Sequence, residues 1–212
     1  MKNSARIAFV MTTSLTLALA ACAPTPAPAP SASESVTPGP SPSSEPTTPV
    51  ADPADPGMWI ISEAGIGPIA IGGDFATTLT DLPDGWSNDA ASCSWTASWN
   101  AEDSSHGLLF VRGGEVPAAP IREISLFTAA ETPTRIDGPE TAEGLGIGST
   151  ADEILAAHPD AEKGAALIGM GSWIRLAGDG EAHVFFEFRE GVTGASSVAV
   201  TIGEEPSYEV CG

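Results

Sequence analysis

The chain has 212 residues and a formal net charge of −20 at pH 7, with eight Lys and Arg residues against 28 Asp and Glu residues. Nucleic-acid binding needs clustered Lys and Arg, and so does adsorption to anionic lipid headgroups, so this balance argues against both. The prolines, cysteines and tryptophans are unevenly distributed, and their positions divide the chain into distinct segments.

The first 21 residues have the pattern of an exported chain. Lys2 and Arg6 form a short positive region, and residues 7–21 then run for 15 residues without a charge. A membrane-spanning helix needs about 20 apolar residues, so this run is short for a span and predicts a cleaved signal peptide over residues 1–21. Its removal takes away two basic residues and no acid, which leaves a formal charge of −22.

The four residues Leu19-Ala20-Ala21-Cys22 close this segment. They resemble the lipobox of bacterial lipoproteins, and the resemblance implies cleavage between Ala21 and Cys22 and attachment of diacylglycerol to the Cys22 thiol. Two or three acyl chains on one residue, at about 0.8 kcal/mol per buried CH₂, give stable membrane attachment. We therefore expect a lipid anchor in the cell membrane and an outward-facing chain. A plain secretory signal that contains Cys22 is the alternative.

Residues 22–57 differ in composition from everything that follows. Residues 23–57 hold 11 of the 19 prolines and no Lys, Arg or aromatic residue. Such a segment buries too little apolar surface to offset its chain entropy, so we expect a disordered Pro/Ser/Thr-rich linker. Proline at this density favours an extended chain of up to about 3.1 Å per residue.

Cys93 and Cys211 remain once Cys22 is assigned to lipid. An even pair in an exported chain predicts a disulfide, and two buried free thiols are the alternative. Neither residue has a second Cys or His within a few positions, so the spacing is not that of a zinc site.

Residues 58–212 contain all five tryptophans and six of the seven phenylalanines, so we expect the folded core there. Shifting this segment by 76 positions aligns Ile69-Ala70-Ile71-Gly72 with Leu145-Gly146-Ile147-Gly148, which predicts an internal repeat over residues 58–142 and 143–212. In each copy a short extended stretch precedes a helix cap, Asp74 in the first and Thr150 in the second.

Three strand-like runs follow each expected helix. They cover residues 92–100, 107–112, 121–128, 172–177, 183–189 and 197–203. The alternation is clearest in the fifth run, where Val184, Phe186 and Phe188 share one face and Phe185 points to the other. The expected fold class is α+β, with two repeated units that each place a short helix before about three antiparallel strands.

Gly148–Ile154, at an expected helix start before antiparallel strands, resembles the short motif of the β-lactamase-inhibitor-protein-like group. The whole layout of lipobox, linker, duplicated unit and terminal Cys-Gly is similar to that of actinobacterial lipoproteins of unassigned function. The resemblance implies the fold and carries over no binding residue. The tandem inhibitor proteins keep a disulfide within each repeat, whereas a bond between Cys93 and Cys211 would join the two repeats.

No catalytic, metal or cofactor site is predicted. The Gly65-x-Gly67 pattern is interrupted by Pro68 and is better explained as a turn than as a dinucleotide fingerprint. The three histidines lack metal-ligand spacing, and surface or capping roles account for them.

Trp95 and Trp99 share a strand face, and with Phe185 they are candidate contact residues for a ligand, although core packing is the alternative for both tryptophans. The leading functional hypothesis is a non-enzymatic, lipid-anchored, extracytoplasmic binding or envelope-accessory module. Its expected partner is an envelope protein or a cell-wall glycan. An inhibitor of a secreted hydrolase is the second hypothesis, and an enzyme is the third.

Overall fold

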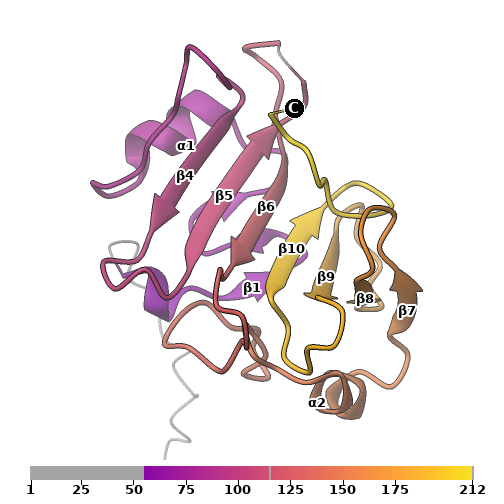
Figure 1. Ribbon diagram of the computed structural model, residues 1–212. Helices are drawn as coiled ribbons and strands as arrows, with labels where there is room; N and C mark the ends of the chain where they lie inside the picture. Colours follow the sequence, from indigo (N-terminus) through magenta and orange to yellow (C-terminus); the bar gives the residue numbers. More distant parts are fainter. Residues whose placement is uncertain (1–54, 115, 212) are drawn as a thin grey trace, which may run out of the picture. The chain divides into compact units, whose positions relative to one another are not determined.

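The computed structural model describes residues 55–114 and 116–211. The predictions for the signal peptide, for Ala21 and Cys22, and for nearly all of the linker lie outside the described residues. The described part of the chain is an α+β fold that is mostly β, with two sheets and two short α-helices (Figure 1). Within it, no helix combines the length and the apolar character needed to cross a bilayer.

The described part begins with a 3-10 turn, Pro56–Met58. A small antiparallel sheet follows, formed by β1 (Ile61–Ser62), β2 (Gly65–Ile66) and β3 (Ile69–Ala70). The helices are α1 (Phe75–Asp81) and α2 (Ala151–Ala157). The large sheet contains β4 (Thr96–Asn100), β5 (Gly107–Arg112), β6 (Ile121–Phe127), β7 (Glu162–Ala165), β8 (Ser172–Arg175), β9 (His183–Phe188) and β10 (Ser197–Thr201).

The large sheet is antiparallel throughout and has the strand order β4-β5-β6-β10-β9-β8-β7. Its central pair is β6 with β10, in which Ile124 lies opposite Val200 and Leu126 opposite Val198. Strands from the ranges 58–142 and 143–212 therefore form one continuous sheet.

Each of the six predicted strand runs contains one observed strand, and the run over residues 107–112 coincides with β5. Strand β7 was not predicted. Its sequence, Glu162-Lys163-Gly164-Ala165, has no alternation of large apolar and polar side chains, which is the signal that identifies a strand in a sequence.

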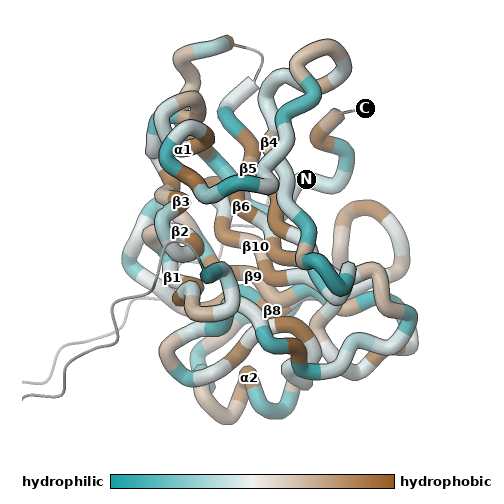
Figure 2. Tube along the Cα trace, turned by 90° about the vertical axis from the view of Figure 1, so that its left-hand side faces the viewer, coloured by the Kyte–Doolittle hydropathy of each residue, from teal (hydrophilic) through white to brown (hydrophobic). Residues whose placement is uncertain are grey.

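The two faces of the large sheet are covered differently. We call one the inner face: it carries Phe110, Ile124, Val200 and Phe186, and α1 and the small sheet pack against it. The opposite, outer face faces the C-terminal segment, residues 202–211. Figures 1 and 2 show the small sheet and α1 on one side and the C-terminus on the other. The main core is therefore the layer against the inner face.

Both helices begin at the predicted caps. The Asp74 side chain accepts a hydrogen bond from the Thr77 N–H at 2.8 Å, and Thr150 and Glu153 form a reciprocal capping box. The pKa values of Asp74 and Glu153 are lowered, mainly because their carboxylates accept these backbone hydrogen bonds. One N–H at the start of α1, that of Thr77, and two at the start of α2, those of Thr150 and Glu153, thereby gain side-chain acceptors, which helps these seven-residue helices persist.

Candidate functional site

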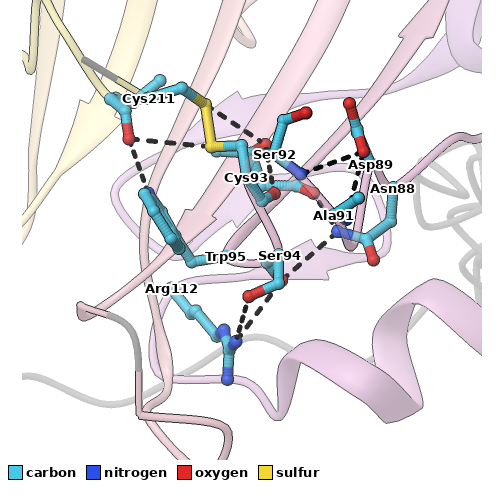
Figure 3. Close-up of a disulfide and its surroundings, with 11 residues drawn as sticks. Asn88, Asp89, Ala91, Ser92, Cys93, Ser94, Trp95, Arg112 and Cys211 are labelled. Atoms are coloured by element: carbon cyan, nitrogen blue, oxygen red, sulfur yellow. Dashed lines mark hydrogen bonds between the residues drawn. A yellow bond between two sulfur atoms is a disulfide. The ribbon is translucent and has the colours of Figure 1, made fainter.

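The predicted cysteine pair forms a disulfide. Cys93 and Cys211 are joined across 118 positions of sequence, with their Cα atoms 5.6 Å apart. The Trp95 indole N–H donates to the Val210 carbonyl oxygen at 2.5 Å, so the ring lies against the chain next to Cys211 (Figure 3). The bond fastens the C-terminal segment to the residues just before β4 and so joins the ranges 58–142 and 143–212.

The C-terminal segment is also held by a buried carboxylate on the outer face. Glu123 of β6 is 1% exposed and accepts hydrogen bonds from the Ser207 N–H at 3.1 Å and from the Ser207 hydroxyl at 2.9 Å. The Thr201 hydroxyl donates to the same carboxylate at 3.0 Å. A buried carboxylate needs such partners, so this segment is an integral cover of the outer face.

Glu187 of β9, beneath this cover, and Tyr208, within the cover, complete the polar layer on the outer face. Burial raises the pKa of Glu187, and the charges of Glu123 and Glu205 raise it further, against the lowering effect of hydrogen bonds from Ser197 and Tyr208. Burial also raises the pKa of Tyr208 to about 12. Both groups lie where the cover meets the sheet, and their pKa shifts follow from that position.

The prediction that Phe185 supplies an outward contact surface is wrong. Phe185 lies on the outer face as the alternation indicates, but its side chain is 0% exposed. Its ring packs edge-on against Trp173 at a centroid distance of 5.4 Å. An outer face covered by the C-terminal segment leaves this ring no access to a partner.

Trp95 and Trp99 do not form an exposed aromatic platform. Both side chains are half-buried, and Trp99 packs against the main core with its ring 5.6 Å from the ring of His106. Trp95 is oriented by its hydrogen bond to Val210. Core packing, the alternative stated for both, applies to Trp99, whereas Trp95 contacts the C-terminal segment.

The histidines occupy separate places. His106 is buried beside β5, His158 caps the C-terminus of α2 with its Nε2 3.7 Å from Glu143, and His183 is half-buried on the outer face. Among residues 55–114 and 116–211, no group of three or more His, Cys, Asp or Glu side chains is arranged to hold a metal ion.

The surface feature that sequence reasoning missed is the hairpin between β7 and β8. Its tip, residues 166–171, exposes three aliphatic side chains: Leu167 is 81% exposed, Met170 72% and Ile168 53%. The run Ala-Ala-Leu-Ile-Gly-Met-Gly in the sequence is the signal, because it combines aliphatic residues with turn-forming glycines and contains no charged residue. Exposed apolar side chains that cluster in this way mark interaction sites.

The backbone of the hairpin tip is attached to the C-terminal segment. The Leu167 N–H donates to a Glu205 carboxylate oxygen at 3.2 Å, and the Tyr208 hydroxyl lies 3.5 Å from the same oxygen. Glu205 and Tyr208 belong to the C-terminal segment, which the disulfide fastens at its far end. The tip is therefore held through the backbone of Leu167, while the Leu167 side chain stays exposed.

An open hollow of about 790 Å³, which we call the inner hollow, lies beside the hairpin on the inner-face side. Met170 of the tip, Ile174 of β8 and Phe188 of β9 line it, and so does Val192 in the loop after β9. Its charged side chains are two acids and two bases: Asp152, Glu190, Lys163 and Arg189. In a strongly acidic chain this is a locally balanced and largely apolar surface.

A second open hollow of about 460 Å³, the outer hollow, lies on the outer-face side of the same strands. Trp173, Arg175 and His183 line it together with Glu162 of β7. Glu204 and Glu205 of the C-terminal segment complete it. Arg175 forms an ion pair with Glu162 at 2.5 Å, so Glu204 and Glu205 leave this hollow acidic.

No protein-family model matches the chain, and no curated protein or solved structure matches it either. The similarity to the β-lactamase-inhibitor-protein-like group and the lipoprotein character therefore stay predictions.

Proposed function

We propose that this chain is a lipid-anchored, extracytoplasmic, non-enzymatic binding module that contacts a partner protein through the β7–β8 hairpin. The observation that carries the proposal is the hairpin tip, where Leu167, Ile168 and Met170 are exposed next to an open apolar hollow. A tip whose backbone is held in place and whose aliphatic side chains are exposed has the features of a contact surface, since apolar area buried on association supplies binding free energy.

Two features support the extracytoplasmic location. The segment Leu19-Ala20-Ala21-Cys22 has the residue pattern of a lipidation site behind a signal-like run. The Cys93–Cys211 disulfide agrees with an oxidising compartment, where such bonds form and persist.

The chemistry of the tip favours a protein partner over a glycan. Sugar rings are typically recognised by exposed aromatic faces, and the tip offers only aliphatic side chains. The two tryptophans that were candidates for sugar stacking, Trp95 and Trp99, are half-buried in other contacts.

We also propose that the domain arose by duplication and that the hairpin is an addition to the second copy. Gly72 and Gly148, which the 76-residue shift aligns, both have φ of +80° and both precede a capped helix. The first copy continues from α1 to three strands, β4 to β6. The second inserts β7 before its three, β8 to β10.

The hairpin is tested by capture of partners from envelope extracts with the domain and with the double variant Leu167→Ser/Met170→Ser. We expect the enriched protein to be lost by about tenfold or more in the double variant. Met58→Ser is the matched control, because Met58 is 53% exposed at a distant element. Equal enrichment by the double variant and the parent would refute the hairpin as the contact surface.

The anchor is tested separately with Cys22→Ala. We expect the protein to leave the membrane fraction for the medium and to lose metabolic labelling by a fatty acid, because the thioether is the attachment point of the acyl chains. Membrane retention with no loss of label would contradict the lipid anchor and leave the hairpin proposal standing.

Inhibition of a secreted hydrolase is the second candidate, and the exposed tip is the observation that favours it, since an aliphatic loop can occupy an active-site cleft. Incubation with class A β-lactamases is the specific test. Undiminished hydrolysis at excess domain would eliminate this form of the hypothesis.

A further inference from the structure

The two edges of the large sheet are in different states. At the β4 edge, Ser87 and Ser98 exchange two backbone hydrogen bonds of 2.8 Å, so another part of the chain covers that edge. At the β7 edge, no backbone hydrogen bond is formed on the open side within the described residues. The sheet therefore has one closed and one open end.

The ladder fixes which groups of β7 face the open side. The Ala166 N–H donates to the Gly171 oxygen, and this pair continues the β7–β8 register in which Gly164 lies opposite Trp173. Hydrogen-bonded and non-hydrogen-bonded pairs alternate in an antiparallel ladder. Lys163 and Ala165 consequently direct their N–H and C=O groups away from β8, toward the open edge.

The inner and outer hollows lie on opposite faces of this same edge. Lys163 and Ile174 are cross-strand partners on the inner side, and both line the inner hollow. Glu162 and Arg175 are cross-strand partners on the outer side, and both line the outer hollow. A strand added to β7 would place alternate side chains over these two hollows, because side chains alternate between faces with a period of two.

The hollows differ in chemistry, and this difference defines the added strand. The inner hollow has a largely apolar lining with balanced charges. The outer hollow carries three carboxylates, from Glu162, Glu204 and Glu205, against Arg175 and His183. Side chains over the inner hollow should be apolar, and side chains over the outer hollow should be basic.

We propose that the open edge of β7 binds an extended segment of a partner protein in which apolar and basic side chains alternate, by addition of a strand to the large sheet. This inference rests on the proposed function and names the recognised chemistry. Lys163 and Ala165 present only a short row of backbone groups, so the two hollows must supply most of the selectivity.

The test uses short synthetic peptides of alternating Val and Lys, titrated into the domain by calorimetry. Peptides of alternating Val and Glu, and a Val/Lys peptide with N-methyl groups on alternate amides, are the comparison. We expect the Val/Lys peptide to bind about tenfold or more tightly than either. Equal binding of the Val/Glu peptide, unchanged binding of the N-methyl peptide, or no binding of the Val/Lys peptide would overturn the proposal.

Variants of the domain give an independent readout. Ala165→Pro removes one outward N–H and keeps the bonds to β8, and we expect it to weaken Val/Lys binding by about tenfold, whereas Ala165→Ser keeps the N–H and the affinity. Glu204→Lys should weaken binding of the same peptide, whereas Glu102→Lys, at an exposed residue between β4 and β5 near the opposite edge of the sheet, should not. Unchanged affinity in Ala165→Pro would overturn strand addition.

Two further outcomes separate this proposal from its foundation. If the tip variant Leu167→Ser/Met170→Ser loses the captured partner while Ala165→Pro retains it, the proposed function stands and strand addition is overturned. Sedimentation equilibrium decides whether a second copy occupies the edge. A dimer that Ala165→Pro alone dissociates would assign the edge to self-association and overturn the proposal.

Discussion

Gly72 and Gly148 share a backbone conformation that L-residues rarely adopt, with φ of +80° at each. Their surroundings differ. A Cβ at Gly148 would lie 2.1 Å from the backbone carbonyl carbon of Thr134, whereas a Cβ at Gly72 would meet nothing within 4 Å. The left-handed conformation alone costs an L-residue about 1–2 kcal/mol, so any excess at Gly148 reports the clash.

We predict that Gly72→Ala lowers the free energy of unfolding by about 1–2 kcal/mol and that Gly148→Ala lowers it by clearly more. A backbone atom cannot move aside as a flexible side-chain end can, so the second change must shift the chain around Thr134. Urea denaturation of both variants measures the difference. Equal losses would show that the Thr134 segment yields without cost.

Burial lowers the pKa of His106, against the opposing charges of Asp103 and Asp137. The unfolded chain takes up a proton near the ordinary pKa of about 6.5, and the folded chain does so only at lower pH. The contribution of His106 to stability is therefore full above this value and is lost as the pH falls toward the folded-state pKa.

We predict that acidification from about pH 7.5 to about pH 5.5 lowers the unfolding free energy of the parent more than that of His106→Gln. For one proton, this difference changes by no more than about 1.4 kcal/mol per pH unit. Thermal unfolding at the two pH values measures this difference, with His183→Gln as the control. The same acid sensitivity in parent and His106→Gln would contradict the assignment.

At the scale of elements, both helices are seven residues long and depend on their caps and on packing. Isolated helices of this length are marginal in water, so the capping box at Thr150 and Glu153 has a measurable role. It holds the start of α2, where Thr150 also lines the inner hollow.

We predict that Thr150→Ala costs about 1 kcal/mol of unfolding free energy, because the Glu153 N–H loses its side-chain acceptor. Thr132→Ala, an exposed change without a hydrogen bond among the described residues, should cost much less. Urea denaturation of the pair gives the values, and a cost for Thr150→Ala no greater than the control would contradict the role of the cap.

The elements were predictable from the sequence to different degrees, for identifiable physical reasons. Strands β9 and β10 were found because their side chains alternate, and β5 because it is a short apolar run between turn residues. The cap at Thr150 was found because Glu153 completes a capping box, and the cap at Asp74 because the 76-residue shift places it near the same position. Strand β7 was missed because its side chains carry no such alternation, and the hairpin was missed with it.

The error at Phe185 has a different origin. Alternation indicates which residues share a face, and it placed Phe185 opposite Val184 and Phe186, as β9 does. It does not indicate what covers that face. Residues 202–211 cover that face. Their position depends on the bond between Cys211 and Cys93 and on the hydrogen bond from the Ser207 N–H to the Glu123 carboxylate. Both Cys93 and Glu123 are distant in sequence from the segment that they hold.

At the scale of the whole described unit, the disulfide and the C-terminal segment connect the start of β4 with the hairpin tip at Leu167. The loop that the bond closes spans 118 positions, and the chain-entropy account gives about 5 kcal/mol for such a loop. The segment between these points also shields the outer face.

We predict that the double variant Cys93→Ser/Cys211→Ser loses up to about 5 kcal/mol of unfolding free energy and exchanges amide hydrogens faster in residues 202–211 and in the hairpin tip. The segment loses its distal attachment, so its contacts at Ser207 and Glu205 open more often. Urea denaturation and hydrogen exchange measure the two effects. Unchanged amide exchange in the hairpin tip would show that the C-terminal segment holds the tip without the Cys93–Cys211 disulfide.

The wide spacing of the two bonded cysteines also separates them in time during synthesis of the chain. A ribosome adding about 5–20 residues per second needs on the order of 10 s to make the 118 positions between them, so Cys93 waits as a thiol for that time. Cys22 has already emerged and is the nearer candidate for a wrong crosslink. Acylation of Cys22 would remove this competing thiol before Cys211 is synthesised. One modification would then provide membrane attachment and also prevent a wrong disulfide.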